Sequence, residues 1–102
     1  MNDKKIKILV VDDKEGPRYD LKRAAEGDNR QIIEASDTDG AIRLINEIDF
    51  HIVVTDMWLE ENREGGLTVL REAKKKDPIT QVIVVTAFGR AEKGPEIYKY
   101  NN

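Results

Sequence analysis

The feature that most constrains the fold is an alternation of short apolar runs with segments of helical character. Four runs rich in β-branched residues are expected to be strands, and they cover residues 6–11, 30–36, 52–55 and 81–86. Only Lys7 interrupts the first run, which is typical of a strand that is covered on both faces. Strands that alternate with helices form right-handed βαβ units, so the sequence predicts a parallel sheet between layers of helices.

Three segments between these runs carry the end signals of helices. Pro17 suits the first turn of the first helix, and Asp37 is expected to cap the second. The third follows a polar loop through Gly66 and ends at three consecutive lysines before Pro78, where cations favour a helix C-terminus. Apolar residues recur at helical spacing in the three segments: Leu21, Ala24 and Ala25; Ala41, Leu44, Ile45 and Ile48; Leu67, Leu70 and Ala73.

The segment after residue 86 begins like another helix, but Gly94 and Pro95 interrupt it and no further strand is expected. The predicted fold class is therefore α/β: a flavodoxin-like three-layer sandwich whose parallel sheet has the order 2-1-3-4, with the fifth strand absent. Residues 82–85 would then form an exposed apolar edge, which invites pairing. We expect a fragment or a natural short variant of a longer protein, a homodimer through the fourth-strand edge, or a tail that folds back over it.

The length of 102 residues favours a single domain, and the expected absence of a fifth strand makes this domain, 1–102, incomplete at its C-terminus. A net charge of −3 gives no basic face for nucleic acid. No apolar run approaches the roughly 20 residues of a membrane span, and no signal peptide is evident. The chain has no cysteine, which excludes disulfides and thiolate metal sites. A cytoplasmic protein is expected.

Two of the predicted strands run directly into aspartates. Asp12 and Asp13 follow the first strand, and Asp56 follows the third. In open α/β sheets ligands bind beyond the carboxyl ends of the strands, where the strand order reverses. In the order 2-1-3-4 that crevice lies between the first and third strands. The sequence therefore predicts that three carboxylates meet, with no lysine or arginine beside them at the strand ends.

The meeting of these aspartates predicts a magnesium site. Asp12 and Asp13 alone would be explained equally well as a turn and a helix N-cap, and it is Asp56 at the neighbouring strand end that favours a metal. Hard oxygen ligands in an incomplete shell favour Mg²⁺, which retains waters and bridges to phosphate. Asp56 becomes a candidate nucleophile for a phosphoryl group. Thr86, which ends the fourth strand, is placed to donate its hydroxyl to an anion on Asp56.

At these residues the chain resembles a response-regulator receiver domain of two-component signalling. The resemblance runs from about residue 5 to 89 and includes, in order, "ILVVDD", "IVVTDMWL", "GGLTVLREAKKKDP" and "VIVVTAFG". It implies that Asp56 accepts a phosphoryl group from a sensor histidine kinase or a phosphotransfer protein. It further implies that Asp12, Asp13 and the backbone carbonyl of Trp58 complete a Mg²⁺ site, with Asp13 the more direct ligand, and that Thr86 contacts the phosphoryl group. Such a domain is a signalling phosphoacceptor rather than an enzyme.

The chain departs from the family pattern in two places. The loop "MWLEENREGGL" after Asp56 lacks the usual proline and is about two residues longer than is common. The family's phosphate-pairing lysine and its switch aromatic lie on the fifth strand, which is expected to be absent here. Lys93 is too close to Thr86 in sequence to replace that lysine, and Tyr98 and Tyr100 occupy no equivalent position.

Two alternative functions remain open. A degenerate or truncated receiver would act as an unphosphorylated interaction module, which the missing lysine favours. An aspartyl-nucleophile phosphohydrolase would also place its nucleophile after an apolar strand. That chemistry usually has a second acid two residues further on, and Trp58 occupies this position.

Overall fold

The computed structural model describes residues 5–60, 63–86 and the backbone of 96–100. Its elements, in chain order, are β1 (Ile6–Val11), α1 (Glu15–Ala25), β2 (Arg30–Ala35), α2 (Thr38–Glu47), β3 (Ile52–Asp56), α3 (Gly65–Lys76), β4 (Gln81–Thr86) and β5 (Glu96–Tyr100). The four predicted strands and three predicted helices are all present. None of the helices in this part of the chain combines the length and the apolar character that crossing a bilayer requires.

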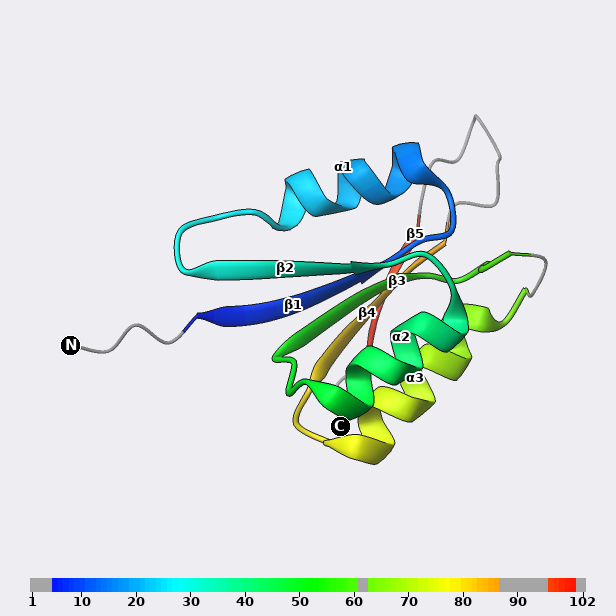
Figure 1. Cartoon of the computed structure of the whole chain (residues 1–102). Coiled ribbons are helices and arrows are strands. Elements are labelled where there is room, and N and C mark those ends of the chain that lie inside the picture. Colours follow the sequence, from blue (N-terminus) through cyan, green and yellow to red (C-terminus); the bar gives the residue numbers. More distant parts are fainter. Residues whose placement is uncertain (1–4, 61–62, 87–95, 101–102) are drawn as a thin grey trace.

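The strands form one sheet with the order β2-β1-β3-β4-β5. The pairs β1–β2, β1–β3 and β3–β4 are parallel, which confirms the predicted order 2-1-3-4. Figure 1 shows α1 on one side of the sheet and α2 with α3 on the other, so the sheet is the middle of three layers. The expected flavodoxin-like architecture is therefore present.

The prediction that the fifth strand is absent was wrong. β5 pairs antiparallel with β4, and Thr86 lies opposite Glu96 in the register. The edge of β4 that was expected to be exposed is therefore paired within the chain, and the expected basis for a homodimer through that edge is removed. The expectation that the tail folds back over this edge is confirmed. The physical reason is that the unpaired N–H and C=O groups along an apolar edge strand form hydrogen bonds with another strand.

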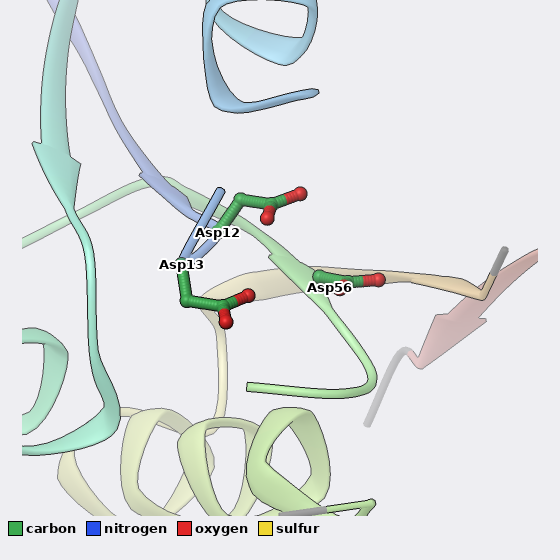
Figure 2. Close-up of side chains that lie close together, drawn as sticks. All are labelled: Asp12, Asp13 and Asp56. Carbon is green, nitrogen blue, oxygen red and sulfur yellow. The ribbon is translucent and has the colours of Figure 1, made fainter. Parts of the chain in front are cut away.

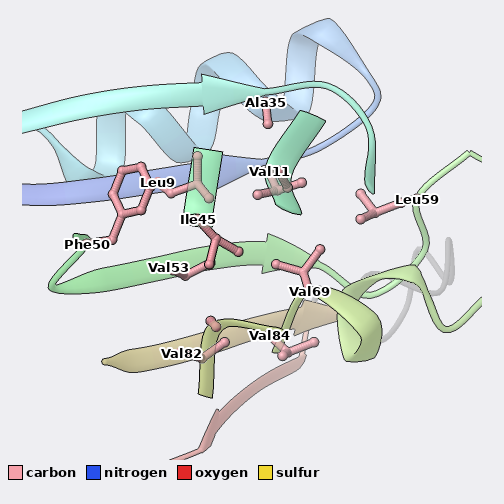
Figure 3. Close-up of a cluster of buried hydrophobic side chains, with 12 residues drawn as sticks. Leu9, Val11, Ala35, Ile45, Phe50, Val53, Leu59, Val69, Val82 and Val84 are labelled. Atoms are coloured by element: carbon pink, nitrogen blue, oxygen red, sulfur yellow. The ribbon is translucent and has the colours of Figure 1, made fainter. Parts of the chain in front are cut away.

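The main core lies between the sheet and the pair α2 and α3. Side chains from alternate positions of β1, β3 and β4 point to this side and meet α2 and α3 (Figure 3). The cluster consists of Leu9, Val11, Ala35, Ala41, Ile45, Phe50, Val53, Leu59, Val69, Ala73, Val82 and Val84. Burying one such leucine or valine side chain contributes roughly 1.5–3 kcal/mol. This layer therefore holds the three central strands in fixed register.

The other face of the sheet is covered less completely. Ile8 and Val10 are buried, but none of the residues of α1, all of which the structure describes, is buried. The apolar stripe expected on α1 is thus only partly confirmed, because Leu21 and Ala25 are half-buried and Ala24 is exposed. A helix that packs over the edge strand β2 and its neighbour β1 leaves much of its own surface in water.

The ends of α2 and α3 are fixed by side chains. The Asp37 carboxylate accepts a hydrogen bond from the Gly40 amide at 2.6 Å, which confirms the predicted N-cap. At the end of α3, Lys74 donates to the Thr80 carbonyl at 2.6 Å and Lys76 donates to the Ile45 carbonyl of α2 at 2.6 Å. The lysine run is therefore helix-end chemistry, as expected, and one of its members also joins α3 to α2.

The loop between β3 and α3 is anchored by a buried leucine and two glycines. Leu59 is fully buried, and α3 begins at Gly65, so the loop ends earlier than predicted. A Cβ added at Gly65 would lie 2.7 Å from the Leu59 Cβ. A Cβ added at Gly66 would meet the Asp56 carbonyl oxygen and would lie 2.8 Å from the Met57 Cα. The first turn of α3 can approach the end of β3 this closely only because these side chains are missing.

We expect Gly66→Ala to lower the free energy of unfolding by about 1–3 kcal/mol, because the new methyl group meets backbone atoms that have no room to move aside. Gly16→Ala in α1 is the matched control, since a Cβ there meets nothing within 4 Å. We expect it to be neutral or stabilising by up to about 1 kcal/mol. Urea denaturation of both variants measures the difference, and equal stability of the two would contradict the close approach of α3 to β3.

Candidate functional site

Three aspartates meet at the carboxyl edge of the sheet, as predicted. β1 and β3 are parallel neighbours with Val11 opposite Thr55, so the residues that follow emerge side by side. Each of Asp12, Asp13 and Asp56 offers a carboxylate oxygen, and these oxygens all lie within 4.8 Å of one another. Figure 2 shows the carboxylates gathered where the chain leaves β1 and β3.

Asp12 is held from three sides. Its amide donates to the Ala35 carbonyl of β2 at 3.2 Å, which extends the β1–β2 pairing by one step. Its carboxylate accepts a hydrogen bond from the Lys14 amide at 3.0 Å. Its carbonyl accepts one from the Arg18 guanidinium of α1, also at 3.0 Å. With only 4% of its surface exposed, Asp12 has a fixed backbone and a nearly buried side chain.

The other side of the site is held by the backbone around Asp56. The next amide, that of Met57, donates to the Val85 carbonyl of β4 at 2.9 Å. The Met57 carbonyl accepts from the Gly66 amide of α3 at 2.8 Å. The Thr55 hydroxyl donates to the Asp56 carbonyl at 2.9 Å. The end of β3 is thus tied to both β4 and α3, which fixes the backbone that carries the half-buried Asp56 side chain.

Burial and the repulsion of neighbouring carboxylates disfavour the charged forms of Asp12 and Asp56. Burial is the main cause that raises the pKa of Asp12 above its usual 3.8, while the Lys14 amide acts against it. Burial, followed by the negative charge of Asp12, raises the pKa of Asp56 to about 6. Partly buried carboxylates at short mutual distance are an arrangement that a divalent cation would stabilise.

A lysine lies beside the acidic group, contrary to the prediction that none would. The Lys14 ammonium is 3.7 Å from a carboxylate oxygen of Asp13. Its positive charge acts to lower the pKa of both Asp12 and Asp56. The sequence carried a signal for this contact, since Lys14 directly follows Asp13, but where its side chain lies depends on the turn from β1 into α1.

The structure places two further predicted residues near this edge. Thr86 ends β4 and is buried, and the residue before it, Val85, lies opposite Asp56 in the register. Trp58 follows Asp56 by two positions and is 40% exposed, with the Arg63 guanidinium 5.1 Å from the centre of its ring. Thr86 thus lies at the same sheet edge as Asp56, while the indole of Trp58 lies on the surface.

Comparison with known proteins gives a family for this arrangement. The family model described as the response regulator receiver domain matches residues 8–101. The chain belongs to the response regulator receiver domain family. The match continues past residue 89, where the resemblance in sequence was expected to end, and includes the residues of β5.

Named relatives agree with this assignment. The receiver domain is 28% identical over 87 residues to an NtrX-like response regulator of Rickettsia bellii, covering 85% of this chain and 18% of that protein. A crystal structure of a receiver domain protein from Clostridium thermocellum is similar with a TM-score of 0.68 and 32% identity, covering 81% of this chain and 66% of the other. The receiver domain of the Francisella response regulator 1452 has a TM-score of 0.63 and 29% identity, with 84% and 69% covered. The receiver domain thus spans about a fifth of the length of the curated relative.

We expect the stability of the metal-free receiver domain to depend on pH through Asp56. Its pKa is raised on folding, so the folded state favours the protonated form; this stabilisation is present below about pH 4 and is lost as the pH rises through about 6. Asp56→Asn should therefore raise the free energy of unfolding relative to the unmodified chain more at pH 7.5 than at pH 4.5, by roughly 1–2 kcal/mol.

Urea denaturation in the presence of a chelator, at both pH values, measures this difference. Asp28→Asn is the control, because Asp28 is exposed in the turn between α1 and β2, outside the acidic group. A gain for Asp56→Asn that is the same at both pH values would contradict the raised pKa.

Proposed function

We propose that this receiver domain takes a phosphoryl group onto Asp56 from a sensor histidine kinase or a phosphotransfer protein, with Mg²⁺ as the cofactor. The observation that carries the proposal is the meeting of three carboxylates at the carboxyl ends of β1 and β3. We further propose that residues 1–102 act as a single cytoplasmic signalling domain, a phosphoprotein rather than an enzyme that acts on separate substrates.

The donor set fits Mg²⁺. Asp12, Asp13 and Asp56 supply only carboxylate oxygens, the hard ligands this ion prefers, and three protein groups leave room for water and phosphate. The Trp58 carbonyl is the proposed fourth protein ligand. When bound, Mg²⁺ neutralises charge on the phosphoryl oxygens during transfer.

The chain's own residues supply the nucleophile and its surroundings. An Asp56 carboxylate oxygen forms the new bond to phosphorus, and the bond between phosphorus and the donor nitrogen of phosphohistidine breaks, with its electron pair leaving on the imidazole. With a pKa of about 6, Asp56 is mostly ionised at neutral pH and is available as a nucleophile. Thr86, at the end of β4, is proposed to donate its hydroxyl to a phosphoryl oxygen.

Phosphorylation replaces the single negative charge of the Asp56 carboxylate with a phosphoryl group that carries roughly −1.5 to −2, at a partly buried site. The Asp56 carbonyl lies against Gly66, and the Met57 carbonyl accepts from the Gly66 amide, so α3 begins in contact with the modified strand end. A change in charge at Asp56 therefore acts on the loop between β3 and α3 and on the end of β4, where Thr86 lies.

Incubation with acetyl phosphate and Mg²⁺, followed by intact mass measurement, tests the proposal. We expect the mass gain of one phosphoryl group, and we expect the gain to disappear in Asp56→Asn and after removal of Mg²⁺ by a chelator. Asp28→Asn, an exposed aspartate outside the acidic group, should be phosphorylated as the unmodified chain is. The fluorescence of Trp58, the one tryptophan of the sequence, gives a second measurement because it lies two residues from Asp56.

The alternative functions predict other results. Absence of both the mass gain and a Mg²⁺-dependent change in fluorescence would overturn the proposal in favour of an unphosphorylated interaction module. Continuous hydrolysis of a generic phosphomonoester would favour an aspartyl-nucleophile phosphohydrolase.

A further inference from the structure

We propose that Lys14 is the catalytic cation that pairs with the phosphoryl group on Asp56. This proposal rests on the proposed function. The resemblance places the lysine that pairs with the phosphoryl group on the fifth strand, and we assign this role to a lysine in the turn between β1 and α1. The proposal is carried by the position of the Lys14 ammonium, which lies 3.7 Å from a carboxylate oxygen of Asp13, one of the three aspartates that meet here.

The backbone of Lys14 is fixed next to the acidic group by hydrogen bonds. Its amide donates to the Asp12 carboxylate at 3.0 Å, and its carbonyl accepts from the Arg18 amide at 3.0 Å in the first turn of α1. These hydrogen bonds hold the Cα of Lys14, from which the side chain starts, next to the acidic group. The side chain itself is 72% exposed, so its four-carbon stem is free to change direction while the Cα stays in place.

The ion pair between the Lys14 ammonium and the Asp13 carboxylate is weak. The distance to the Asp13 carboxylate is 3.7 Å, and an ion pair as exposed as this one contributes little to stability. A metal ion held by Asp13 would compete for the same carboxylate and release the lysine. A phosphoryl group on Asp56 would then attract the ammonium, because its oxygens carry more negative charge than a carboxylate.

Two neighbouring cations are engaged elsewhere. Arg18 donates to the Asp12 carbonyl at 3.0 Å and to the Glu34 carboxylate at 3.2 Å. Lys22 lies 3.6 Å from the other oxygen of Glu34. Of these three cations from the turn and α1, Lys14 is the one whose ion pair is with a carboxylate of the acidic group.

The lysine on β5 is poorly placed for this role. Lys99 lies opposite Ile83, whereas Asp56 lies opposite Val85, whose partner on β5 is Ile97. The backbone of Lys99 is thus two strands and two residues away from that of Asp56, which amounts to about 12 Å. Lys93 lies outside the residues that the structure describes.

The step that Lys14 would assist is balanced with acetyl phosphate as donor. A carboxylate oxygen of Asp56 bonds to phosphorus, the bond from phosphorus to the acetate oxygen breaks, and acetate leaves with the electron pair. The ammonium neither gains nor loses a proton; it stabilises the negative charge of the phosphoryl oxygens as they pass between the two carboxylates.

Lys14→Gln, compared with Lys22→Gln and Lys14→Arg in the full chain, tests the proposal. Three quantities are measured: Mg²⁺ affinity by calorimetry, beryllofluoride affinity at saturating Mg²⁺ by Trp58 fluorescence, and the initial rate of mass gain with acetyl phosphate. For Lys14→Gln we expect Mg²⁺ to bind equally well or a few-fold more tightly, because a positive charge near the ligands has been removed. We expect beryllofluoride affinity and phosphorylation rate to fall about tenfold, the size of one charge-assisted hydrogen bond.

The opposite directions of these changes separate a catalytic cation from a structural one. Lys14→Arg should retain most of the rate, and Lys22→Gln, which makes the same change in charge on α1, should match the unmodified chain in all three measurements. Unchanged beryllofluoride affinity in Lys14→Gln, or an equal loss of Mg²⁺ and beryllofluoride affinity, would overturn the assignment of Lys14 alone. If the unmodified chain takes up neither beryllofluoride nor a phosphoryl group, the proposed function fails and this assignment fails with it.

Discussion

β1 lies between β2 and β3, and its parallel pairing with β3 determines where the three aspartates of the proposed site lie. The register sets Val11 beside Thr55, so the next residues of both strands emerge at the same edge. The core beneath them holds this register, because a slip of one residue would turn Leu9 and Val53 out of the cluster that α2 and α3 cover. The meeting of Asp12 with Asp56 is thus a result of hydrophobic packing several residues away.

The site combines a firmly held backbone with unfavourable electrostatics. Hydrogen bonds from β2, β4, α1 and α3 reach the peptide groups around Asp12 and Asp56, while the carboxylates repel one another and are partly removed from water. The free energy of this repulsion is offset by the packing of the sheet. Under the proposed function, a cation therefore binds between these carboxylates without a rearrangement of the strands.

The sequence was most informative where a single residue type leaves few options. The β-branched runs predicted the parallel strands, Asp37 predicted its N-cap, and aspartates at two strand ends predicted the acidic group. It was least informative where tertiary contacts decide. The segment 96–100 has only five residues and follows Gly94 and Pro95, and it forms a strand because β4 offers an unpaired edge. Lys14 was missed because its contact with Asp13 depends on the turn into α1, and the burial of Leu59 depends on how closely α3 approaches β3.

The antiparallel pairing of β5 with β4 gives the sheet two borders of different character. β2 is parallel to β1 and is joined to it through the crossover that contains α1, whereas β5 is antiparallel to β4. Removing β5 breaks one ladder and leaves the β1–β3 pair and its aspartates intact. Amide hydrogens of β5 should therefore exchange with solvent through local opening, at a lower free energy than those of β1 and β3, which exchange when the whole domain unfolds. The hydrogen bonds of β5 can therefore open while those that hold the acidic site, in the same sheet, remain closed.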